Sequence, residues 1–173
     1  EDDCAGLPEQ DLLETDPLDL ALCYPWHLSA EQAVELALRA ETAAFTVDKR
    51  ITNSEGANVH AGQSHFVLAN SRGFIAGYPY SRHTISVSPI AGRGANMQRD
   101  DWYSSERDAR KLAKPEAIGR YAAERALSRL NARRLDTRKC AVLFEAPLAA
   151  GLLGAFVQAV SGGALYRKST FLL

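Results

Sequence analysis

The sequence predicts an α+β protein: an antiparallel sheet with packed helices, followed by the start of a second domain. Three observations lead to this prediction. Ser29 and Gln32 form a capping box that opens a run with helical spacing. Residues 84–88 alternate strictly between polar and apolar, and the turn residues 70–73 separate two apolar runs, as in a hairpin. Hydrophobic residues make up 46% of the chain, which is enough for a core.

The first half predicts one helix and several strands. Residues 1–26 are acidic and contain three prolines, which predicts an irregular lead-in with at most a short helix. The capped helix is expected to run through Phe45, and residues 48–56 are either a loop or the start of a strand. The predicted extended segments that follow are residues 65–68 and 74–78 of a hairpin, 84–88, and 97–104.

The second half predicts helix, strand and helix. Pro115 suits the first position of a helix that runs to about Asn131. Residues 139–145 are predicted as a short buried strand, and a buried apolar helix is expected from Pro147 until a glycine pair ends it. Because residues 171–173 resemble the interior of a strand, the chain is expected to be truncated inside a domain. The predicted organisation is a lead-in (1–26), an N-terminal α+β domain (27–136), and the first strand and helix of an incomplete C-terminal domain (137–173).

Composition excludes several functional classes. The net charge is −1, which gives no support for a general polyanion-binding protein. Three widely spaced cysteines contain no CxxC pair and favour a reducing compartment over a disulfide framework. The uncharged segment 146–166 has a suitable length for a membrane span, but its glycine, proline and alanine content favours a helix in a protein core.

A basic stripe on the helix after Pro115 leaves one alternative open. Arg125, Arg129 and Arg133 recur every four residues. A solvated helix face is the favoured interpretation, because no aromatic side chains accompany the arginines as they do in many nucleic-acid sites. Nucleic-acid contact is the less favoured alternative.

The residues alone predict no catalytic centre and no metal site. The histidines form no HExxH helix, and His60 and His65 lie at an odd spacing that puts them on opposite faces of a strand. No G-x-S-x-G elbow is present, and residues 162–170 lack the glycine that a phosphate loop needs before its lysine. Arg167, Lys168 and Ser169 can contact a carboxylate or a peptide backbone, although an exposed polar turn is the simpler interpretation.

Several runs occur together and in order between His27 and the end of the chain, and this ordered set is specific. In sequence order they are 48–56 (DKRITNSEG), 70–74 (NSRGF), 77–78 (GY), 81–83 (SRH), 99–103 (RDDWY) and 162–172 (GGALYRKSTFL). Together they resemble the PmbA/TldE branch of the TldD/PmbA family (peptidase U62, "modulator of DNA gyrase"). Members of this family are much longer, so the chain resembles their N-terminal portion.

The resemblance implies a subunit of a cytoplasmic two-subunit metalloprotease that degrades unfolded or flexible polypeptides and processes peptide precursors. The metal-bearing TldD-like subunit carries an HExxxH motif, whose places fall here at Gly154, Ala155 and Ala159. None of these side chains can bind zinc or act as a base. This chain is therefore expected to hold no cofactor, and zinc is expected in the TldD-like partner. Without that partner, the chain can form a homodimer. The alternatives are a regulatory protein that modulates DNA gyrase and, least favoured, a standalone hydrolase.

Overall fold

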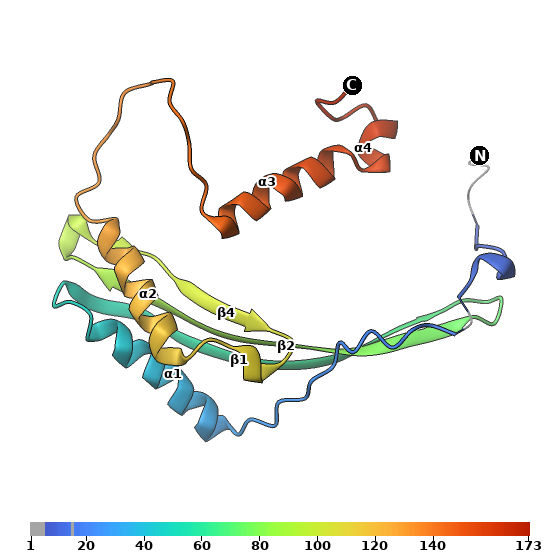
Figure 1. The fold of residues 1–173 in the computed structure, drawn as a ribbon, viewed down its shortest axis with the longest axis horizontal. Coiled ribbons are helices and arrows are strands. Elements are labelled where there is room, and N and C mark those ends of the chain that lie inside the picture. Colours follow the sequence, from blue (N-terminus) through green and yellow to red (C-terminus); the bar gives the residue numbers. More distant parts are fainter. Residues whose placement is uncertain (1–5, 15) are drawn as a thin grey trace. The chain divides into compact units, whose positions relative to one another are not determined.

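The computed structural model describes residues 6–14 and 16–173, which divide into two compact units (Figure 1). The first unit extends to Ala132, and the second comprises Arg133–Leu173. Each unit is described by itself below. The domain boundaries predicted from the sequence, at residues 26/27 and 136/137, stay predictions.

A four-stranded antiparallel sheet forms the centre of the first unit. Strands β1 (Ile51–Ala69) and β2 (Ile75–Ala91) form a long hairpin, in which Phe66 lies opposite Tyr78. The short strands β3 (Gln98–Arg99) and β4 (Trp102–Glu106) pair with the other edge of β2. The predicted α+β class with an antiparallel sheet is confirmed.

The turn of the hairpin lies where the sequence predicts it. The side-chain oxygen of Asn70 accepts hydrogen bonds from the backbone N–H groups of Arg72 and Phe74, at 2.9 and 3.2 Å. Gly73 adopts a φ of +87°, which a glycine reaches without steric cost. An Asx turn therefore reverses the chain here.

The predicted segments 74–78 and 84–88 are parts of one strand, β2, and their separation in the prediction was wrong. Pro79 lies between them and lacks an N–H group. The N–H of Ser81 points away from β1, because it donates to Leu22 O at 3.0 Å. Since the direction repeats every second residue, position 79 also points its nitrogen away from β1. The proline therefore removes no hydrogen bond between β1 and β2.

Two helices cover one face of the sheet. Helix α1 (Ala30–Phe45) begins with the predicted capping box, in which Gln32 N donates to Ser29 Oγ and Ser29 N donates to Gln32 Oε1. Helix α2 (Pro115–Ser128) has proline at its first position, as predicted, and ends three residues before the predicted Asn131. The helices bury two neighbouring clusters, the first formed by Ala40, Ile85, Val87, Ile118 and Ala122, and the second by Ala44, Ile51, Ala91, Ala123 and Ala126.

The two faces of β2 differ in a regular way. Its odd-numbered residues from Ser81 to Ala91 are buried, whereas the even-numbered residues between them are only partly buried or exposed. The odd-numbered face is the one that contacts the helices, since it carries Ile85 and Val87. The even-numbered face carries Tyr78, Tyr80, Thr84 and Ser86 and has no helix over it in this unit.

The described part of the lead-in is irregular except for one short 3₁₀ helix, η1 (Gln10–Leu12). It is tied to the outer edge of β2. Leu22 O accepts a hydrogen bond from Ser81 N, and Tyr24 N donates to Ser81 Oγ at 2.9 Å. The lead-in therefore packs against the sheet as part of the first unit.

The second unit consists of helices α3 (Ala146–Ala159) and α4 (Gly162–Tyr166). The prediction of a strand at residues 139–145 was wrong, because no strand of the described residues pairs with them and Leu143 is 98% exposed. The prediction of a buried helix was also wrong, because only Ala159 of α3 is buried and α4 is too short to cover the rest. The glycine pair at 162–163 begins α4 instead of ending α3. Among the described residues, no helix combines the length and hydropathy that crossing a membrane requires.

Candidate functional site

A cavity of about 400 Å³ in the second unit brings together residues that the sequence analysis singled out. Four of those residues, Ala155, Ala159, Arg167 and Ser169, line it. Gly154 and Lys168 are not among its lining residues. The remaining lining residues come from the end of α3, from α4 and from the segment after α4, and are Gln158, Ser161, Ala164, Thr170 and Phe171. The polar end of this cavity is therefore built by the segment that follows α4.

The segment after α4 is held by a Schellman motif. Ser169 N donates to Ala164 O at 3.0 Å, and Lys168 N donates to Leu165 O at 3.1 Å. These are the two hydrogen bonds that define the motif. The residue that donates the second of them takes the left-handed conformation, which glycine usually adopts. Here that residue is Lys168, with a φ of +53°. The motif fixes the backbone from which Arg167 and Ser169 project toward the cavity.

Arg167 supplies the positive charge of this cavity. Its guanidinium lies close to Gly163, where a Cβ would come within 3.3 Å of both terminal nitrogens. It forms no ion pair with the described residues. A guanidinium can donate two parallel hydrogen bonds to a carboxylate, and single ones to peptide carbonyls. The cavity can thus hold a carboxylate or a segment of polypeptide backbone.

The three residues at which the resemblance puts the HExxxH motif lie together on α3 but do not fit a zinc ion. Gly154 and Ala155 are exposed and Ala159 is 8% exposed. None of the three has a side-chain nitrogen, oxygen or sulfur, which zinc requires of its ligands. Across residues 6–14 and 16–173, no group of three or more His, Cys, Asp or Glu side chains is placed to hold a metal. No catalytic step through a metal follows from the part of the chain that the structure describes.

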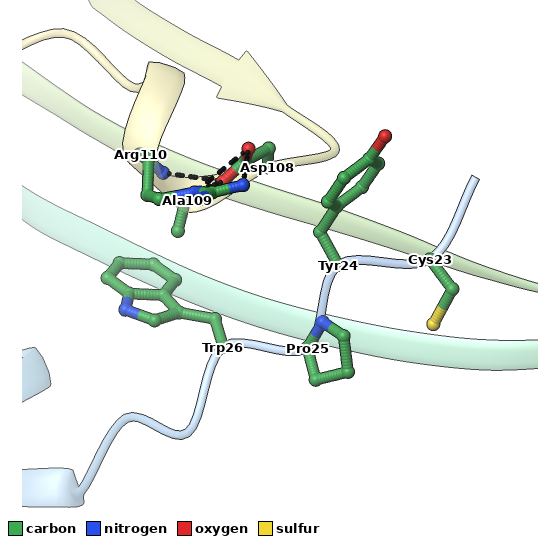
Figure 2. A pocket seen from close by; sticks show the side chains of 7 residues that line it. All are labelled: Cys23, Tyr24, Pro25, Trp26, Asp108, Ala109 and Arg110. Atoms are coloured by element: carbon green, nitrogen blue, oxygen red, sulfur yellow. Dashed lines mark hydrogen bonds and ion pairs between the residues drawn. The ribbon is translucent and has the colours of Figure 1, made fainter. Parts of the chain in front are cut away.

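A second cavity, of about 450 Å³, lies where the lead-in crosses the first unit (Figure 2). The lead-in segment 23–26 forms one side, and the 3₁₀ helix η3 (Ala109–Lys111) with Asp108 forms the other. Arg110 binds the Asp108 carboxylate through its side chain at 2.8 Å and through its backbone N–H at 3.0 Å. Both interactions lower the pKa of Asp108, and the side-chain hydrogen bond lowers it most. The charged groups of this cavity therefore satisfy each other within η3 and its N-cap.

His83 is one of three buried polar residues, with Ser81 and Asp108, among the described residues, and the sequence analysis did not predict its burial. Its side chain has no exposed surface, its Nε2 lies 2.8 Å from Tyr24 O, and its ring meets the Trp26 ring edge-on at 5.4 Å. Because a carbonyl oxygen only accepts, Nε2 is the protonated nitrogen. The alternation of residues 81–87 could have revealed His83, since a strand that buries Ile85 and Val87 also turns residue 83 toward the core.

Two of the three arginines of the basic stripe form ion pairs within the first unit. Asp100 binds both Arg125, at 3.3 Å, and Arg129, at 3.1 Å. Arg125 also lies over the rings of Trp102 and Tyr121, at 5.0 and 5.9 Å from their centroids. Arg133 belongs to the second unit. Two of the three arginines thus hold α2 to the segment before β4.

Replacing Asp100 by asparagine is expected to lower the free energy of unfolding by about 1–3 kcal/mol, because the largely buried Asp100 carboxylate no longer pairs with the partly buried Arg125 and the more exposed Arg129. Burial alone would raise the pKa of Asp100, but the N–H of Asp101 and the two arginines outweigh it and lower the pKa. The ionised form therefore stabilises the folded state above about pH 4, and this contribution is lost as the pH falls through the lowered pKa. Chemical denaturation at several pH values measures the effect.

The control for this variant is Glu55→Gln. Glu55 pairs with Arg99 at 2.7 Å, but both side chains are about half exposed, so the expected loss is about 0–1 kcal/mol. An equal loss for both variants at pH 7, or an Asp100→Asn effect that persists undiminished at pH 3, would contradict the assignment.

A family model described as "PmbA/TldA metallopeptidase central domain" matches residues 23–130. The chain is 45% identical over 172 residues to metalloprotease PmbA of Escherichia coli O157:H7, an alignment that covers 99% of this chain and 38% of the relative. It is 41% identical over 172 residues to a metalloprotease PmbA homolog of Haemophilus influenzae, with coverage of 99% and 38%. The chain therefore spans 38% of the length of these two curated relatives.

Solved structures agree with this match. The structure of a candidate modulator of DNA gyrase from Bacteroides thetaiotaomicron has a TM-score of 0.88 and 23% identity, and the alignment covers 100% of this chain and 40% of the other, which shows a shared fold. A candidate modulator of a DNA gyrase from Thermotoga maritima has a TM-score of 0.56 at 25% identity, with coverage of 63% and 25%. Because the family model covers more than half of the residues, the chain belongs to the PmbA/TldD family of metallopeptidases.

Proposed function

We propose that this chain is part of a PmbA/TldD-type cytoplasmic metalloprotease, in the subunit that contributes no zinc ligand. The observation that carries the proposal is the chemistry of Gly154, Ala155 and Ala159, which stand at the places of the HExxxH motif without a donor atom. A metalloprotease needs His or carboxylate ligands and a general base to activate water. A TldD-like partner subunit would supply these groups.

In this assignment the chain shapes the chamber and contacts the substrate. The proposed substrates are unfolded or flexible polypeptides and peptide precursors that require processing. Arg167, Lys168 and Ser169 are the proposed contacts. Arg167 and Ser169 line the cavity with Ala155 and Ala159, and Lys168 lies between them at the left-handed position of the Schellman motif. Arg167 would bind a substrate carboxylate or backbone carbonyl. Without its partner, the subunit can form a homodimer.

A regulatory protein that modulates DNA gyrase is the second candidate, and the names of the solved relatives favour it. Its support in this chain was the stripe of Arg125, Arg129 and Arg133. Two of these arginines are bound to Asp100, which reduces the positive charge available for a partner. Charge reversal at Arg133 leaves the Asp100 ion pairs intact and separates the two candidate functions. If the protein affects supercoiling by DNA gyrase and this variant loses that effect, the regulatory function is favoured over the protease function.

The zinc content of the full-length protein tests the proposal. Purified without a partner, the protein is expected to hold well below one zinc per chain by elemental mass spectrometry, and purified with a TldD-like subunit, about one zinc per pair. The matched control is the TldD-like subunit with its two motif histidines replaced by alanine, which is expected to remove zinc from the pair. One zinc per chain in the protein alone would contradict the proposed role.

A further inference from the structure

The far end of the β1–β2 hairpin extends beyond helices α1 and α2 (Figure 1), and its apolar side chains are exposed. Phe66, Leu68 and Tyr78 are 47%, 54% and 41% exposed. Phe66 and Tyr78 lie opposite each other on the hairpin, with ring centroids 5.4 Å apart, and the Tyr78 and Tyr80 rings are 6.3 Å apart. Clustered exposed apolar side chains of this kind mark an interaction surface.

The lead-in turns this end of the hairpin into a groove. A cavity of about 610 Å³ lies between the hairpin and the lead-in, where Glu14 and residues 17–20 line it. Phe66, Leu68, Phe74 and Tyr78 line it from the hairpin, and Leu18 and Leu20 from the lead-in. Glu14 and Asp19 line it as well. The groove therefore combines apolar walls with carboxylates.

Negative charge predominates around the groove, and it comes from the lead-in. Residues 56–81 contain no Asp or Glu and a single Lys or Arg, which is Arg72. The described lead-in residues up to Ala21 contain five carboxylates and no Lys or Arg. Arg72 pairs with one of them, Glu9, at 2.9 Å, and the other four have no basic partner among the described residues. A ligand that brings positive charge complements this surface.

The edge of β2 beside the groove also offers backbone hydrogen bonds. The N–H of Ser81 points away from β1, toward the lead-in, and the direction repeats every second residue. The N–H groups of Ile75 and Gly77 therefore point the same way, and no described residue accepts a hydrogen bond from them. Gly77 lines the groove and is exposed. An extended polypeptide is the ligand that can use such an edge.

We propose that this groove binds an extended segment of polypeptide in which apolar residues are flanked by lysine or arginine. The apolar residues pack on Phe66, Leu68 and Tyr78, and the basic residues lie near Glu14 and Asp19. The segment's backbone carbonyls accept hydrogen bonds from the β2 edge. The proposal rests on the proposed function, because it names the kind of unfolded polypeptide that the subunit captures, and it places that capture in the first unit.

Fluorescence anisotropy with three labelled, unstructured peptides tests the proposal on the full-length protein. The peptides share the same leucines and glycines, and their remaining positions are all lysine, all serine or all glutamate. The lysine peptide is expected to bind at least tenfold more tightly than the serine peptide, and the glutamate peptide more weakly still. Added salt is expected to reduce the differences. Equal binding of all three peptides, or no binding, would overturn the proposal.

Three variants locate the binding. Tyr78→Ser is expected to weaken the binding of the lysine and serine peptides alike, by at least tenfold. Glu14→Gln with Asp19→Asn is expected to remove the preference for lysine; these changes keep the side-chain oxygens that accept the N–H groups of Asp16 and Ala21. Tyr103→Ser is the matched control, because Tyr103 is an exposed tyrosine on the same sheet face, opposite Ser86. It is expected to change nothing, and an equal loss there would contradict the location.

Three further outcomes are distinguishable. If no peptide binds and Tyr78→Ser converts a dimer into a monomer in light scattering, a second copy of the chain covers the groove and the proposal is wrong. If no peptide binds but the protein still supports cleavage with a TldD-like subunit, the groove fails and the proposed function stands. If the lysine peptide binds selectively but no cleavage occurs with the partner, the groove stands and the protease role fails.

Discussion

Replacing Gly119 by alanine is expected to lower the free energy of unfolding of the first unit by about 2–3 kcal/mol, because the added methyl group overpacks the contact between α1 and α2. A Cβ at this position would overlap the carbonyl oxygen of Ala40 and lie 3.1 Å from the Cβ of Ala43. Backbone cannot rotate away as a flexible side chain can, so the helices must move apart. Chemical denaturation of the full-length protein, followed by circular dichroism, measures the loss.

Gly151→Ala is the matched control for this change. Gly151 lies inside helix α3, and a Cβ there would meet no atom within 4 Å. The same substitution is expected to be neutral or to stabilise its helix by about 0.5–1 kcal/mol, since alanine favours the helical backbone over glycine. If Gly119→Ala behaved like the control, the close approach of the two helices would be refuted.

Replacing His83 by leucine is expected to destabilise the first unit by about 1–3 kcal/mol, because the Tyr24 carbonyl loses its hydrogen-bond donor at a largely enclosed site. The substitution also removes the edge-on contact with Trp26. Both losses fall on the lead-in segment 23–26, which crosses the first unit here (Figure 2). Limited proteolysis is therefore expected to cut this segment faster than in the unaltered protein, in addition to a lower midpoint of chemical denaturation.

His60→Leu is the control for His83. His60 lies on the same sheet, in β1, and its side chain is exposed. Its replacement is expected to change the free energy of unfolding by less than about 0.5 kcal/mol and to leave proteolysis of the lead-in unchanged. Similar effects at both positions would mean that His83 does not anchor the lead-in.

The sequence was sufficient to predict those helix starts and turns that are determined by residues close together in the chain. The capping box of Ser29 and Gln32 begins α1, Pro115 begins α2, and the Asn70–Gly73 segment makes the hairpin turn. In each case the residues that decide the conformation are within a few positions of one another. The predicted fold class followed from these elements and is confirmed.

The errors concern features that depend on distant partners. Whether β2 breaks at Pro79 depends on which way its nitrogen points, and this is fixed by the pairing with β1 and the lead-in. Whether residues 139–145 form a strand depends on a neighbouring strand, and apolar character alone supplies none. Helix α3 is apolar on all sides, but burial requires another layer, which the short α4 cannot provide.

The candidate site was predicted in part. That the HExxxH places fall at Gly154, Ala155 and Ala159 stays a prediction of the resemblance. The structure puts two of these residues, Ala155 and Ala159, beside Arg167 and Ser169 in one cavity. The sequence did not indicate that Lys168 would occupy the left-handed position of a Schellman motif, because glycine is the usual residue there. The groove at the hairpin end was also not predicted, since its walls come from segments about fifty residues apart in the chain.

Hydrolysis of an unfolded polypeptide tests the central claim most directly. The full-length protein is assayed alone, with a TldD-like subunit, and with that subunit in the presence of a chelator. Cleavage is expected only in the pair, and the chelator is expected to abolish it. A TldD-like subunit without its motif glutamate serves as the inactive control. Cleavage by the full-length protein alone, or by the pair after the partner's glutamate is removed, would contradict the assignment of this chain to a subunit without catalytic residues.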